Sequence, residues 1–76
     1  MNIDQAIKKA SVDLKRYQIK SALLDCEILM SKALNKSRKF IIMNPNEKIN
    51  DYEYDNFRAF ISSRIKRKPI AYITGE

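Results

Sequence analysis

The spacing of apolar residues predicts an amphipathic helix at the start of the chain. These residues recur in alternating steps of four and three, which places them on one helical face. They are Ile3, Ile7, Ala10, Leu14 and Tyr17. Asn2 can cap the first turn, and Asp4 and Lys8 form a favourably oriented pair four residues apart. We therefore expect a helix that begins at Ile3 and continues to Tyr17.

A second and more apolar helix is predicted from Ser21, its expected cap, to about Leu34. One broad face collects most of its apolar residues when they are placed at 100° intervals. This face contains Ala22, Leu23, Cys26, Leu29, Met30, Ala33 and Leu34. Leu24 and Ile28 fall on the other side, among charged residues. Such a helix is either central and covered from two directions, or it presents Leu24 and Ile28 to a partner.

A short third helix is predicted after Ser37, with Phe40, Ile41 and Met43 docked on the core. The turn at 44–46, Asn-Pro-Asn, ends this segment. Four consecutive apolar residues, 40–43, are also compatible with a buried strand, because so short a run has no diagnostic period. The chain offers no second strand with which it could pair, so we favour the helix.

The clearest helix begins at Asn50, which forms a capping box with Glu53. Four residues share its apolar face, with Phe60 beside them. They are Tyr54, Phe57, Ile61 and Ile65. Pro69 can start one further turn, 70–74, which Gly75 closes. The predicted fold class is therefore all-α: a small bundle of four helices plus a short fifth C-terminal helical turn.

Composition and charge limit the function classes. The 76 residues form one domain, and the single cysteine excludes an internal disulfide, which favours a reduced, cytoplasmic setting. Apolar runs are too short to cross a bilayer, so no membrane contact is expected. The net charge of +6 favours acidic partners. Cutting the chain after Lys36 leaves equal positive charge on both sides, so we expect the charge to be spread over the fold.

The chain carries no constellation suited to catalysis by itself. It has no histidine and no glycine-rich phosphate loop. Asp25 and Glu27 lie two residues apart on a helix and point about 160° away from each other, so we expect solvated or bridging surface charges. Cys26 lies on an apolar face, which predicts a buried, inert thiol. We assign no catalytic, cofactor-binding or metal-binding residue to this chain.

Binding is the remaining role, and basic residues dominate the candidates. The densest basic run closes the fourth helix, where the helix dipole favours cations, so a plain solvated terminus is the simplest interpretation. Contact with nucleic acid, with an acidic protein or with a neighbouring domain are the alternatives. Tyr52 is the aromatic residue expected to be exposed. The candidate partner-binding surface consists of Leu24, Ile28, Lys36, Arg38, Lys39, Tyr52, Arg64, Lys66, Arg67 and Lys68.

Three segments together resemble one family. The segments 24–30 (LDCEILM), 34–45 (LNKSRKFIIMNP) and 69–76 (PIAYITGE) are similar, in this order, to the N-terminal region of the HemK/PrmC methyltransferases. Where members commonly carry Gly-Glu before the last segment, this sequence has Arg67-Lys68, which makes the end of the fourth helix more basic and can lengthen it. The family continues beyond the position of Glu76, so we expect a fragment cut at a domain boundary.

The resemblance implies a division of labour between two domains. Residues 1–76 would form a five-helix N-terminal domain that helps to recognise the substrate. A Rossmann-like domain, expected after residue 76, would hold S-adenosyl-methionine and methylate the glutamine of the Gly-Gly-Gln motif in peptide chain release factors. The implied partners are release factors and the chain's own catalytic domain. A free-standing basic module that binds nucleic acid and a plain protein-interaction domain are the alternatives, although nucleic acid is not the favoured partner.

Overall fold

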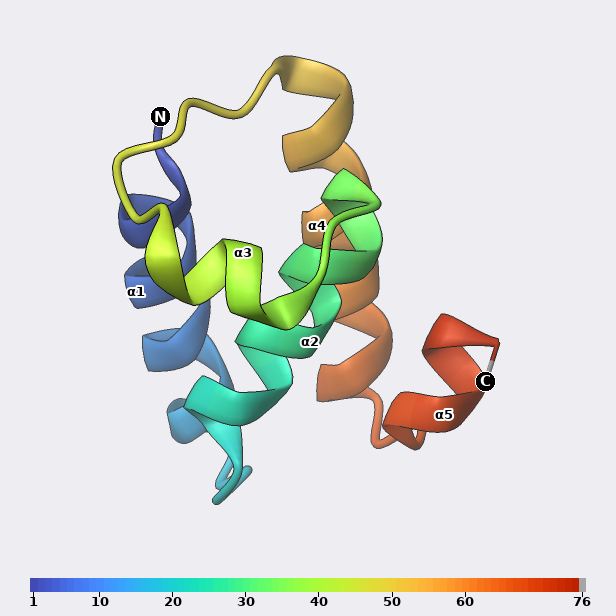
Figure 1. Ribbon diagram of the computed structural model, residues 1–76. Coiled ribbons are helices and arrows are strands. Elements are labelled where there is room, and N and C mark those ends of the chain that lie inside the picture. Colours follow the sequence, from blue (N-terminus) through green and yellow to red (C-terminus); the bar gives the residue numbers. More distant parts are fainter. Residues whose placement is uncertain (76) are drawn as a thin grey trace.

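Five helices account for the architecture of the chain (Figure 1). The computed structural model describes residues 1–75, and Glu76 lies outside the described residues. The helices are α1 (Ile3–Arg16), α2 (Ala22–Leu34), α3 (Arg38–Met43), α4 (Asp51–Ile65) and α5 (Ile70–Thr74). Within residues 1–75 the extended structure is limited to an isolated antiparallel bridge between Asn2 and Lys48. The prediction of an all-α bundle with a short fifth helix is confirmed.

Side-chain caps fix the beginnings of the two longest helices. The Gln5 backbone N–H donates to Asn2 Oδ1 at 2.8 Å, and the Asn2 N–H donates to Gln5 Oε1 at 2.9 Å. Asn50 and Glu53 form the same capping box at the start of α4. These reciprocal bonds satisfy backbone donors that have no partner within the helix. The predicted caps at Asn2 and Asn50 are confirmed.

The other two predicted caps have different outcomes. Ser37 accepts a hydrogen bond from the Phe40 N–H at 3.0 Å, as expected. Ser21 precedes α2, but its hydroxyl donates to Asp25 Oδ2 at 2.9 Å, so the expected cap at Ser21 is wrong. The hydroxyl binds a carboxylate four residues along because that carboxylate points into the bundle rather than into solvent.

Helix α2 lies at the centre of the bundle and packs against all four other helices. Its Cys26, Leu29 and Met30 are fully buried. Phe57 and Ile61 of α4 are fully buried too, and they complete the core together with residues of α1 and α3. Burial of these large apolar side chains is the main source of stability in a domain of this size.

The connection between α3 and α4 satisfies the start of α1. The carbonyls of Glu47 and Pro45 accept hydrogen bonds from the N–H groups of Ile3 and Asp4, at 2.9 and 3.0 Å. The first N–H groups of a helix have no partner within it, so an external acceptor stabilises that end. These two hydrogen bonds therefore hold the N-terminus of α1 against the connection between α3 and α4.

Three helices end in the same kind of turn. In this Schellman motif one residue adopts a left-handed conformation and the next N–H returns to the last helical turn. Gln18, Asn35 and Arg67 are the left-handed residues, with φ of 63°, 54° and 69°. The returning bonds run from Ile19 to Leu14, from Lys36 to Ser31 and from Lys68 to Ser63. Helix α4 is therefore not lengthened through Arg67-Lys68, contrary to the expectation from the sequence.

The left-handed turn at Gln18 predicts a stabilising substitution. A left-handed conformation costs a residue with a Cβ about 1–2 kcal/mol, whereas glycine adopts it freely but has more conformational entropy when unfolded. We expect Gln18→Gly to raise the free energy of unfolding by about 0.5–1 kcal/mol in urea titrations. Arg67→Gly should gain less, because Arg67 Nη2 also donates to the Tyr17 carbonyl at 2.6 Å. A loss of stability in Gln18→Gly would contradict this interpretation.

Several residues predicted to lie in the core are exposed. Leu23 is 56% exposed, because the buried face of α2 is narrower than the sequence indicated and leaves Leu23 at its edge. Met43 is 68% exposed, since α3 is short and inserts Ile41 alone fully into the core. Tyr17 follows the last residue of α1 and is exposed, and the Schellman turn buries Ile19 in its place.

Candidate partner-binding surface

The ten candidate binding residues do not form one surface. Helices α2 and α4 run in opposite directions, so the end of α2 and the beginning of α4 lie at one end of the bundle (Figure 1). Lys36 follows α2, and Tyr52 lies in the first turn of α4. Lys39 lies in the first turn of α3, next to Arg38, which is bonded to Glu27 in the first half of α2. Lys66 and Lys68 follow α4 at the opposite end. The predicted set is therefore divided between separate regions of the surface.

Arg64 is not available as a surface cation. Its Nε donates to Asp25 Oδ2 at 2.9 Å, and its Nη1 donates to the Lys68 carbonyl at 3.0 Å. The Asp25 side chain is only 5% exposed and that of Arg64 20%. The prediction that Arg64 offers a binding surface is therefore wrong. Asp25 is a bridging charge, which is one of the two roles expected from the sequence, but it is buried rather than on the surface. The pair joins the first turn of α2 to the last turn of α4.

The cations around the start of α3 differ in their surroundings. Arg38 Nε donates to Glu27 Oε1 at 3.2 Å, so Glu27 is the bridging carboxylate that the sequence suggested. The Lys36 ammonium lies 5.3 Å from the ring centroid of Phe40. Lys39 is exposed. Lys36 and Lys39 are therefore the cations of this region whose substitution breaks no ion pair that the structure shows.

The two apolar candidates on α2 are exposed to different extents. Leu24 is 43% exposed. Ile28 is half-buried, because it lines a small crevice with Thr74 of α5. Helix α2 is thus central, and at the same time it presents Leu24 to solvent. Tyr52 is 75% exposed, as predicted.

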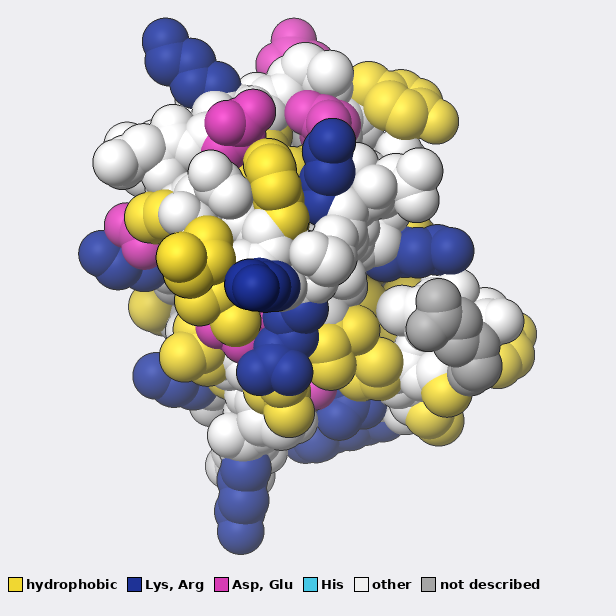
Figure 2. Space-filling model, viewed as in Figure 1, with side chains coloured by type: hydrophobic (Ala, Val, Ile, Leu, Met, Phe, Trp, Pro, Cys, Tyr) yellow, Lys and Arg dark blue, Asp and Glu magenta, His cyan; other side chains and the backbone are white. Residues whose placement is uncertain are grey.

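Folding gathers six exposed cations at the end of the bundle where α1 and α4 end and α2 begins. We call this set the basic pole: Lys15, Arg16, Lys20, Lys66, Arg67 and Lys68. The hydrogen bond from Arg67 to the Tyr17 carbonyl joins the two parts of the set. Figure 2 shows Lys and Arg side chains at the lower end of the molecule and also over other parts of the visible face. A shallow hollow of about 390 Å³ lies between Lys15, Gln18, Ile19 and Lys20.

The basic pole carries as much charge as the whole chain. The sequence has fifteen basic and nine acidic residues, so the nine basic residues outside the pole equal the acidic ones in number. Asp13 and Asp25, the acidic residues in the adjoining helical turns, are bonded to Arg58 and Arg64. Exposed basic residues also lie elsewhere on the fold, as expected, and the structure adds that segments distant in sequence bring six of them together at one end.

A second feature that sequence reasoning missed is an apolar groove of about 140 Å³ between α1, α2 and α3. Leu23, Ile42 and Pro45 line it, with Ile7 beneath. Leu23 and Ile42 are each at least half exposed. Neither residue could have been identified from the sequence, because their periodicity also fits a buried face.

The one thiol of the chain is poorly suited to nucleophilic chemistry. Cys26 is fully buried on α2. Burial, and next the nearby Asp25 carboxylate, raise the pKa of Cys26 from 9.0 to about 12. At neutral pH the thiolate, which is the reactive form, is therefore scarcely populated. The prediction of a buried, inert thiol agrees with this environment.

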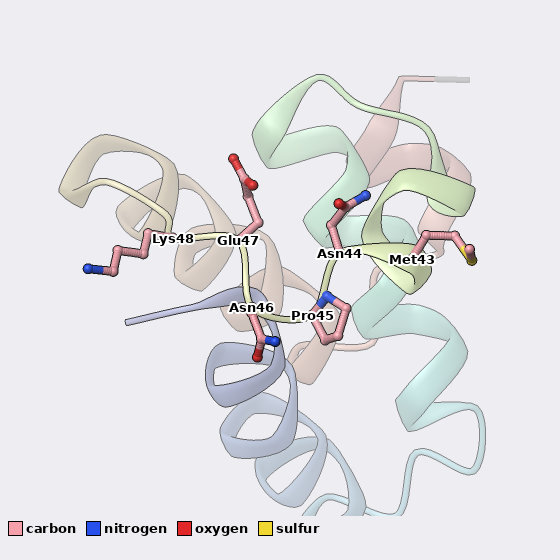
Figure 3. Close-up of a pocket in the computed structure, with 6 residues that line it drawn as sticks. All are labelled: Met43, Asn44, Pro45, Asn46, Glu47 and Lys48. Carbon is pink, nitrogen blue, oxygen red and sulfur yellow. The ribbon is translucent and has the colours of Figure 1, made fainter.

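The hollow over the connection between α3 and α4 is lined by Met43, Asn44, Pro45, Asn46, Glu47 and Lys48. Figure 3 shows that the Met43 and Lys48 side chains point away from each other at its two ends. A ligand site needs polar groups that converge on one point, and these side chains diverge. Among residues 1–75, no group of three potential metal ligands is found. No helix of the described chain is long and apolar enough to span a membrane.

Comparison with known proteins identifies relatives over almost the whole chain. A bifunctional methyltransferase of Rickettsia felis is 35% identical over 74 residues, which are 97% of this chain and 14% of that protein. A release factor glutamine methyltransferase of Leptospira interrogans is 40% identical over 70 residues, or 92% of this chain and 24% of that protein. The corresponding protein of Coxiella burnetii is 33% identical over 76 residues, 100% of this chain and 27% of its own.

The chain therefore spans about a quarter or less of the length of these relatives. Comparison with solved structures gives no significant match. The family model of the PrmC N-terminal domain matches residues 5–75, which include all of α2 to α5 and most of α1. This chain belongs to the PrmC N-terminal domain family.

Proposed function

We propose that this chain is the substrate-recognition domain of a protein methyltransferase that modifies the glutamine of the Gly-Gly-Gln motif in peptide chain release factors. The observation that carries the proposal is the family match over residues 5–75, together with relatives named release factor glutamine methyltransferase. The bundle exposes charged and apolar surface at several places, which suits contact with a large protein. Binding the whole release factor would bring one glutamine to the transferring methyl group, a contribution of proximity and orientation.

The proposal assigns the chemistry to a catalytic domain that follows residue 76 in the full-length enzyme. S-adenosyl-methionine, bound there, supplies the methyl group. This chain has a single glycine, Gly75, and so lacks the glycine-rich turn with which doubly wound domains approach a nucleotide cofactor. We therefore assign no residue of this chain to the cofactor.

The experiment that tests the proposal follows methyl transfer by the full-length enzyme. Radioactive S-adenosyl-methionine is the donor, and an intact bacterial release factor and a short Gly-Gly-Gln peptide are the two acceptors. We expect label on the motif glutamine, confirmed by mass spectrometry, and a higher kcat/KM for the intact factor than for the peptide. Label at another residue, or equal kcat/KM for the two acceptors, would contradict the proposed recognition role.

A paired substitution tests the contribution of the surface near α3. Lys36→Glu with Lys39→Glu reverses two exposed charges and spares Arg38, whose guanidinium is bonded to Glu27. We expect KM for the intact factor to rise about fivefold, because interfacial charges mainly affect encounter and affinity. The kcat with the peptide should stay at the wild-type value. An unchanged KM for the intact factor would exclude this region from docking.

A further inference from the structure

We propose that the basic pole is the electrostatic docking site for an acidic face of the protein substrate. This inference rests on the proposed function and adds the surface and the chemistry of recognition. Six exposed cations of the pole match the net charge of +6, and the two adjoining carboxylates already have internal partners. A concentrated field of one sign attracts an oppositely charged partner and speeds its encounter.

Hydrogen bonds hold the segments that carry these cations in fixed positions. Arg67 Nη2 is bonded to the Tyr17 carbonyl, and Arg64 joins Asp25 to the Lys68 carbonyl. Schellman turns fix the backbone just after α1 and α4. Since the backbone is ordered before binding, less conformational entropy is lost when a partner docks.

The pole lies beside the beginning of the last helix of the bundle. Lys68, the last cation of the pole, lies two residues before α5. Helix α5 packs against both α2 and α4 (Figure 1). A protein docked on the pole would therefore lie beside the beginning of α5, whereas Thr74 near the end of α5 shares a crevice with Lys32 and Lys36 at the end of α2.

Apolar residues around the pole favour a protein over a nucleic acid. Leu24, exposed in the first turn of α2, and Tyr17, exposed after α1, lie beside the cations. Aromatic residues are enriched at protein interfaces, and an exposed leucine gains nothing from a phosphate backbone.

The test compares two triple variants of equal net charge in the full-length enzyme. The pole variant is Lys15→Glu/Lys20→Glu/Lys66→Glu, and the matched control is Lys9→Glu/Lys32→Glu/Lys48→Glu, whose three lysines are exposed outside the pole. We expect the pole variant to lose about tenfold or more in kcat/KM for an intact release factor at low salt, through KM. The control should lose at most about threefold, and circular dichroism melting checks that both variants are folded.

Direct binding of the release factor, measured by fluorescence anisotropy at two salt concentrations, separates this inference from the proposed function. Methyl transfer that fails while binding still depends on the pole would overturn the proposed function alone. Equal losses in the two variants, or wild-type binding by the pole variant, would overturn the docking site. Binding of a short single-stranded RNA is measured in the same way. If the pole variant lost RNA binding but kept wild-type release-factor binding, the docking site would be overturned and the pole would be assigned to nucleic acid.

Discussion

Replacing Phe57 by alanine is expected to remove a large fraction of the stability of the domain. Phe57 is fully buried in α4, the helix that packs against both α1 and α2. Removing a buried phenylalanine ring costs about 3–5 kcal/mol, because apolar burial is lost and a cavity remains. A domain of this length has a total stability of only about 4–11 kcal/mol. The substitution therefore removes a large part of the free energy that holds the bundle together.

Urea denaturation followed by circular dichroism measures this effect. Tyr52→Ala is the matched control, because it removes an aromatic ring from the same helix at a position that is 75% exposed. We expect the control to change the free energy of unfolding by less than about 0.5 kcal/mol. A loss below about 1.5 kcal/mol in Phe57→Ala would show that the core closes around the gap, and would contradict the packing described above.

The local features of the fold could be predicted because short-range rules determine them. The cap at Asn2 and the capping box at Asn50 depend on residues three positions apart, and both are present. The apolar face of α4 depends on a period of 3.6 residues, and Phe57 and Ile61 lie in the core as expected. The predicted helix boundaries came from the same two signals, the capping residues and the helical period.

The wrong predictions about burial concern which face of a helix is covered and where the chain turns after a helix. Leu23 and Leu24 are adjacent apolar residues on a helix that is apolar nearly all round, so periodicity alone could not decide how much of either is covered. The arrangement of α1 and α3 around α2 leaves both partly exposed. The burial of Ile19 was not predicted. It results from a Schellman turn in which Gln18, rather than a glycine, is the left-handed residue, and this turn directs Ile19 into the core. Glycine, or less often asparagine, marks such a turn in a sequence, and Gln18 is neither.

The candidate surface was predictable only in part, for a related reason. The run around Lys66 is visible in the sequence, and its members other than Arg64 are exposed. Its association with Lys15 and Lys20 depends on contacts between residues about fifty positions apart, such as the Arg67 to Tyr17 bond. Composition could establish the net charge but not which basic residues meet at one end of the bundle.

Asp25→Ala is the second substitution expected to have a large effect. The Asp25 carboxylate accepts hydrogen bonds from Ser21 Oγ and Arg64 Nε, both at 2.9 Å. Without it the Arg64 guanidinium is left partly buried, with only the Lys68 carbonyl as a described partner. Breaking a buried ion pair costs about 3–5 kcal/mol, and the 20% exposure of Arg64 lowers our estimate to about 2–3 kcal/mol.

The comparison that distinguishes this buried pair from an ordinary surface pair is Asp4→Ala. Asp4 and Lys8 form an exposed pair at 3.0 Å on α1, and its loss should cost less than about 1 kcal/mol. Because a desolvated charge needs its partner, Asp25→Leu combined with Arg64→Met should recover much of the stability that Asp25→Ala loses. Thermal and urea unfolding of the variants measure these differences. If Asp25→Ala were as mild as Asp4→Ala, the Asp25–Arg64 contact would not join α2 to α4 as the structure indicates, and the fixed geometry of the basic pole would lose one of its supports.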